Sequence, residues 1–168
     1  MLNSRWSATL TLLFGILLLG FSPGLFAQAN STPEERARWV ELSHKLETDP
    51  LDGALNKEAE KAVKRLIEVH DVHVALCGSV FTDLNASKSK YSGQITRQYL
   101  LASAAFVIEN PEKAAESGLV NLYAVQSVLK VYGAILQKKS DSRSPSLDAF
   151  LKDQDAGTLE ASVRKKCG

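Results

Sequence analysis

The spacing of hydrophobic and polar positions after residue 30 is typical of amphipathic helices joined end to end. Over residues 54–69, apolar side chains recur at steps of three and four, and charged side chains cover the remaining positions. Thr32, Pro33 and Glu35 have the order of a helix start, with a hydroxyl cap, proline at the first helical position and a glutamate that completes a capping box. The pattern therefore predicts helices over residues 33–47 and 54–69.

The stretch from Val69 to Val74 is ambiguous, because its alternating valines also suit a short strand. We favour a helix boundary here, with Asp71 as the cap of a third helix that runs to about Asn85. This helix would present one apolar face, formed by Val72, Leu76, Val80, Phe81 and Leu84. The polar stretch 86–90 then separates two helical halves.

The fourth helix is predicted from Ser92, as its cap, to Glu109. Between Leu100 and Ile108 it carries no charge, so we expect most of its sides to be buried. Another helix is predicted to follow immediately, with Asn110 as its N-cap and Pro111 as its first helical residue.

That fifth helix carries a heptad-like seam of apolar side chains. Its members follow steps of four and three residues: Gly118, Leu122, Val125, Leu129, Tyr132 and Leu136. The seam could pair with a second subunit or pack against a neighbouring helix of the same chain. We favour the second interpretation, and hence a monomer.

Two short helices, over residues 146–153 and 158–166, are predicted to close the chain, with Gly157 between them. The fold class expected for residues 30–168 is therefore all-α, a single compact domain of about five to seven helices. A strict tetratricopeptide array is not expected, although Pro111 and Pro145 have its 34-residue spacing. Placing that repeat's last proline on Pro111 puts Tyr99 and Phe106 where the repeat requires alanine.

Residues 1–29 have the features of a secretory signal peptide. Arg5 precedes a nearly continuous apolar run, Pro23 interrupts that run, and small residues at Ala27 and Ala29 match a cleavage site after Ala29. The alternative is an uncleaved membrane anchor over residues 6–26, which is just long enough to cross a bilayer. We expect cleavage, export to the periplasm or the extracellular space, and no stable membrane anchor afterwards.

Export affects the interpretation of the two cysteines, Cys77 and Cys167, because an oxidising compartment favours a disulfide between them. Neither lies in a CxxC or zinc-binding pattern, so a reactive or metal-binding thiol is the weaker alternative. Leu159, Val163 and Cys167 fall at four-residue steps, which predicts that the second sulfur faces the core.

Charge excludes one class of partner. The chain has 20 Lys and Arg residues against 19 Asp and Glu residues, and loss of residues 1–29 removes one arginine and no acid. Proteins that bind nucleic acid usually carry excess positive charge, which attracts the phosphates. This chain has no such excess, so nucleic acid is not expected as a partner.

The histidines provide the one pattern that suggests catalysis. His44 and the doublet His70-Asp71 resemble the ligand pattern of the metal-dependent HD phosphohydrolases, in which a later aspartate such as Asp83 would complete the set. The resemblance implies a metal-dependent hydrolase. The alternative is structural, with Asp71 as a helix cap and the histidines at an exposed helix start.

No phosphate loop, GxSxG elbow, HExxH or CxxCH sequence is present. Our first hypothesis is therefore an exported, non-enzymatic binding or scaffolding module without a cofactor, which binds an unknown protein or a small amphipathic ligand. We expect its binding groove between the fourth and fifth helices, formed by Tyr99, Leu100, Phe106, Leu122, Tyr123 and Tyr132. Asn30 and Asn85 begin glycosylation sequons, which matter only in a host that uses them.

Overall fold

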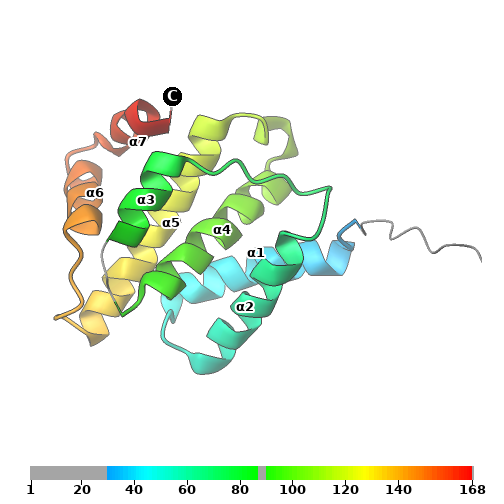
Figure 1. Cartoon of the computed structure of the whole chain (residues 1–168), viewed down its shortest axis with the longest axis horizontal. Helices are drawn as coiled ribbons and strands as arrows, with labels where there is room; N and C mark the ends of the chain where they lie inside the picture. Colours follow the sequence, from blue (N-terminus) through cyan, green and yellow to red (C-terminus); the bar gives the residue numbers. More distant parts are fainter. Residues whose placement is uncertain (1–29, 87–89, 168) are drawn as a thin grey trace, which may run out of the picture.

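The computed structural model describes residues 30–86 and 90–167, and the side chains of residues 85 and 86 are not described. The expected leader and its cleavage site therefore lie outside the described residues, as does Ser87 of the Asn85 sequon. The described part is a compact, all-helical domain (Figure 1). Its elements are α1 (Pro33–Thr48), α2 (Gly53–Leu66), α3 (Gly78–Ala86), α4 (Ser92–Glu109), the 3-10 turn η1 (Pro111–Lys113), α5 (Ser117–Lys138), α6 (Pro145–Asp155) and α7 (Leu159–Cys167).

Local signals account for where the first helices begin. The capping box at α1 is present: the Glu35 N–H donates to Thr32 Oγ1 at 3.2 Å, and the Thr32 N–H donates to Glu35 Oε2 at 2.8 Å. At α2, the carboxylate of Asp52 accepts a hydrogen bond from the Leu55 N–H at 2.7 Å. These contacts satisfy backbone donors that a helix leaves unpaired in its first turn.

α4 is the central helix and packs against α1, α2, α3 and α5. The expectation that most of its sides are buried is confirmed, since residues 101–105 are all fully buried. Tyr99 and Ala102 face a larger cluster shared with α3, α5, α6 and α7, whereas Leu101 and Ala104 face a smaller cluster shared with α1 and α2. One helix, with an uncharged stretch from Leu100 to Ile108, therefore supplies one wall of each of two cores.

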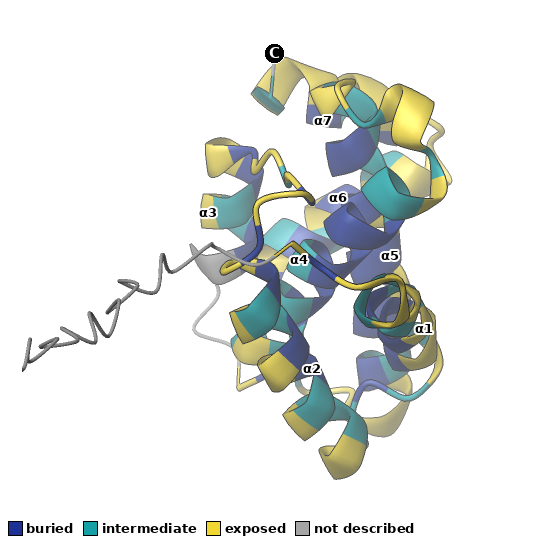
Figure 2. Ribbon diagram, turned by 90° about the vertical axis from the view of Figure 1, so that its right-hand side faces the viewer, coloured by how far each residue is buried: buried dark blue, intermediate teal, exposed yellow. Residues whose placement is uncertain are grey.

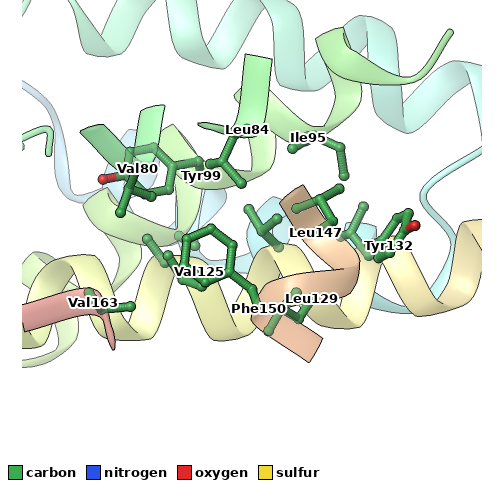
Figure 3. Close-up of a cluster of buried hydrophobic side chains, with 14 of the residues drawn as sticks. Val80, Leu84, Ile95, Tyr99, Val125, Leu129, Tyr132, Leu147, Phe150 and Val163 are labelled. Atoms are coloured by element: carbon green, nitrogen blue, oxygen red, sulfur yellow. The ribbon is translucent and has the colours of Figure 1, made fainter. Parts of the chain in front are cut away.

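The larger cluster joins the five consecutive helices α3 to α7. Figure 3 shows side chains from α3, α4, α5, α6 and α7 in contact around α5. Val125, Leu129 and Tyr132 of the seam are buried there, so the seam packs within the chain. By length and composition α5 is the one described helix that could cross a membrane, and more than half of that stretch is buried inside the protein, as Figure 2 illustrates.

The prediction of a helix starting at Asp71 is wrong. The segment 67–77, which we call the linker, is not helical, and α3 begins only at Gly78. The Asp71 carboxylate binds Ser31, 40 residues earlier, instead of capping the next turn. Val69 and Val72 are buried against α1 and α2, and Leu76, which was assigned to the apolar helix face, is exposed.

The prediction that the fifth helix starts at Pro111 is also wrong, because residues Pro111–Lys113 form only a 3-10 turn and α5 begins at Ser117. The side chain of Asn110 does not cap this turn, and its Nδ2 donates backwards to the Phe106 carbonyl at 3.0 Å. α4 likewise starts without a side-chain cap, after Tyr91 rather than after Ser92.

Cys77 and Cys167 form a disulfide in the structure, with their Cα atoms 5.3 Å apart. Leu159 and Val163 are buried on the same face of α7, as their spacing predicted. Next to the bridge, the Cys77 N–H donates to Tyr99 Oη at 3.3 Å and to Asn121 Oδ1 at 3.2 Å. The end of the linker is thus fastened to α4, α5 and α7 together.

Candidate functional site

The side chains expected to form a groove between α4 and α5 are divided by the fold. Tyr99 and Tyr132 are almost completely buried. The Tyr132 hydroxyl donates to Asp148 Oδ1 at 2.9 Å and accepts from the Ser144 N–H at 2.7 Å, so it secures the start of α6. Both tyrosines are core residues in this structure and do not line an open groove.

The other four side chains, those of Leu100, Phe106, Leu122 and Tyr123, are half-buried. The rings of Phe106 and Tyr123 lie 5.3 Å apart between centroids, in a tilted arrangement. Burial raises the pKa of the Tyr123 hydroxyl, and the negative charges of Glu109 and Glu47 raise it further. Tyr123 is therefore a neutral hydrogen-bonding group beside two carboxylates.

The three residues of the metal-site hypothesis have different environments. His44 Nε2 lies 3.4 Å from Glu109 Oε1 at the surface, whereas Asp71 is bound to Ser31. His70 is exposed. Across residues 30–86 and 90–167, no three His, Cys, Asp or Glu side chains are grouped so that they could hold a metal ion. His44, His70, Asp71 and Asp83 consequently do not form the ligand set that the resemblance implied.

Tyr123 lies at the edge of a polar hollow between α1 and α5, which we call the α1–α5 cleft. Its lining comprises Glu47, Tyr123, Gln126, Ser127, Lys130 and Gln154. The Ser127 Oγ donates to Glu47 Oε1 at 2.6 Å, and Lys130 Nζ lies 2.8 Å from Glu47 Oε2. The charged groups of this cleft thus satisfy one another.

Behind the cleft, the buried Gln98 fastens three helices. Its Nε2 donates to the Ser43 carbonyl of α1 at 3.0 Å and to Ser127 Oγ of α5 at 2.6 Å. Buried polar groups need such partners, because an unsatisfied one costs about 1 to 3 kcal/mol. The simplest role for this network is to hold α1, α4 and α5 in register.

A second hollow, which we call the linker pocket, has a different lining. It has a volume of about 310 Å³ and is formed by α1, the linker, the end of α4 and the residues around η1. Its lining is mostly apolar: Val72, Val107, Ile108, Pro111 and Ala114, with Arg36 and Asp71 as the two charged members. A concave apolar surface with a few polar groups is the usual form of a small-molecule site.

The linker wall of this pocket is held in place through Asp71. Its Oδ1 accepts from the Ser31 N–H at 2.8 Å, and its Oδ2 accepts from the Ser31 Oγ at 2.8 Å. The hydrogen bond from the Ser31 backbone is the main cause that lowers the pKa of the Asp71 carboxyl. Asp71 is therefore a stable anion that fastens the linker to the segment preceding α1.

Sequence reasoning did not identify the linker pocket. Val107 and Ile108 belong to the uncharged stretch of α4 that is expected to be buried, and no sequence pattern singles out Arg36. Asp71 was singled out for capping or metal binding, and it performs neither role here. The pocket depends on contacts between segments more than 30 residues apart, which local pattern does not encode.

Comparison with known proteins adds no assignment: no protein-family model and no solved structure matches this chain.

Proposed function

We propose that this chain is an exported, non-enzymatic binding module whose linker pocket holds a small amphipathic ligand. The observation that carries the proposal is the mostly apolar lining, in which Val72, Val107 and Ile108 stand beside the charged Arg36 and Asp71. In contrast, the α1–α5 cleft is lined by polar side chains, and its two charged members, Glu47 and Lys130, pair with each other.

The size of the linker pocket limits the ligand. Its volume of about 310 Å³ is at the lower end of the range for small-molecule sites, roughly 300 to 1,000 Å³. Since a water molecule occupies about 30 Å³ of the liquid, the pocket accommodates roughly ten non-hydrogen atoms. An eight-carbon chain with one polar end has this size.

Titration calorimetry with a series of linear alcohols tests the proposal. Each methylene placed in the pocket contributes about 0.8 kcal/mol, so affinity should rise severalfold per carbon and level off near 1-octanol, when the pocket is full. Val107→Trp, which fills the pocket with an indole, should abolish the binding of 1-octanol. Ala114→Leu, a smaller change outside the helices, should weaken it.

The matched control is Gln126→Trp, which introduces the same ring at the α1–α5 cleft. It should leave the binding of 1-octanol unchanged. Absence of saturable binding to the wild-type protein, or equal binding by Val107→Trp, would refute the linker pocket as a ligand site.

Export is the second component of the proposal. In a host with a secretory pathway, mass spectrometry without reductant should give a mature chain that begins at Asn30 and is two hydrogens lighter than the reduced form. The expected mass rests on the small residues at Ala27 and Ala29 and on the Cys77–Cys167 bridge. An intact leader or two free thiols would contradict it.

A further inference from the structure

The arginine at the rim of the linker pocket has unused hydrogen-bonding capacity. Arg36 and Asp71 are the two charged side chains of the lining, and the shortest contact between them is 3.9 Å, from Arg36 Nη1 to Asp71 Oδ2. This is an ion pair without a hydrogen bond. Within the described residues, the guanidinium of Arg36 makes no hydrogen bond.

Asp71 forms an ion pair with Arg36 at 3.9 Å but accepts no hydrogen bond from it, and each of its oxygens accepts one from Ser31 at 2.8 Å. Other arginines in this half of the molecule differ in this respect. Arg65 Nε donates to Glu35 Oε1 at 2.8 Å, and Arg38 Nε donates to Glu58 Oε1 at 2.7 Å. The guanidinium of Arg36 thus donates to no group of the described residues, and it lines the same pocket as Val72, Val107 and Ile108.

We infer that the linker pocket takes a medium-chain monocarboxylate, with its hydrocarbon chain on Val72, Val107 and Ile108 and its carboxylate on the guanidinium of Arg36. This inference rests on the proposed function and adds the chemical class of the ligand. A planar guanidinium matches a carboxylate with two parallel hydrogen bonds. The negative charge of Asp71 beside the site repels a doubly charged anion, such as a phosphate monoester, more strongly than a singly charged carboxylate.

Titration calorimetry with octanoate, methyl octanoate and 1-octanol, each below its aggregation concentration, tests the inference. All three share the chain, and only octanoate carries the charge. Charge-assisted hydrogen bonds contribute enough that octanoate should bind about tenfold more tightly than either neutral compound. Arg36→Gln should remove this advantage without weakening the binding of 1-octanol, and Arg36→Lys should keep part of it.

The control for general electrostatics is Lys130→Gln, which removes one positive charge at the α1–α5 cleft. It should leave the binding of octanoate unchanged. Equal affinities for the acid and its methyl ester, or an unaltered octanoate affinity in Arg36→Gln, would overturn the carboxylate assignment while the pocket itself stands. If none of the three compounds binds, both the inference and the proposed function fail.

Discussion

The two cores on either side of α4 are closed by different kinds of contact. The larger core, formed with α3, α5, α6 and α7, is closed covalently by the Cys77–Cys167 bridge. The smaller core, formed with α1, α2 and the linker, is closed by reversible contacts at its edge: Ser31 with Asp71, Arg65 with Glu35, and Arg38 with Glu58. Contacts of the second kind open locally at lower free-energy cost.

The linker pocket belongs to the side with reversible closure, since Arg36, Asp71 and Val72 form part of its wall. Binding sites are commonly found in parts of a protein that open locally at low cost. The comparison leads us to propose a division of roles, in which the disulfide side provides stability and the linker side would admit the proposed ligand.

The largest expected effect is on the disulfide side. Replacing both cysteines by alanine releases a constraint between residues 90 positions apart, which the chain-entropy model values at about 4 to 5 kcal/mol. Denaturant unfolding should show this loss while circular dichroism stays helical. Coincident unfolding curves for the double variant and the oxidised wild type would contradict the role given to the bridge.

An intermediate effect is expected in the smaller core. Leu42 is fully buried between α1 and its neighbours, and Leu42→Ala should lower the free energy of unfolding by about 3 kcal/mol. Hydrogen exchange should accelerate mainly in α1 and α2. The control is Val163→Ala in α7, on the other side of α4, which should accelerate exchange mainly in the helices of the larger core. If either variant accelerates exchange equally on both sides of α4, the division into two regions is refuted.

The smallest effect concerns the edge contact itself. Asp71→Asn should destabilise the fold less than Leu42→Ala and should speed exchange in the linker. Because the pKa of Asp71 is lowered from its ordinary value of 3.8, its contribution is present above that value and is lost as the pH falls through the lowered pKa. The free energies of unfolding of wild type and variant should therefore differ at neutral pH and converge in acid. A difference that stays constant down to pH 2 would contradict the role of the Asp71 carboxylate in fastening the linker to Ser31.

Most of the helices could be predicted because their signals are local. The capping box of Thr32 and Glu35 is contained within four residues, and the uncharged run in α4 reports burial without reference to its partners. The disulfide was predictable because two cysteines allow one pairing. These features need no knowledge of how distant segments meet.

The linker could not be predicted because a distant partner outweighs a local signal. Asp71 has the character of a helix cap, and Ser31 offers it two hydrogen bonds from 40 residues away. Burial of Val69 and Val72 then favours the non-helical linker over a helix. The linker pocket depends on the same contact between Ser31 and Asp71, which local sequence patterns do not encode. The sequence therefore predicted a groove between α4 and α5 and not the linker pocket.

The most direct test of this account is an isotope-filtered NMR experiment on the oxidised protein with bound octanoate. We expect intermolecular contacts from the octanoate chain to the methyl groups of Val72, Val107 and Ile108, which line the linker pocket. Contacts to the side chains of the α1–α5 cleft instead, or none at a saturating concentration, would contradict the assignment of the linker pocket as the binding site.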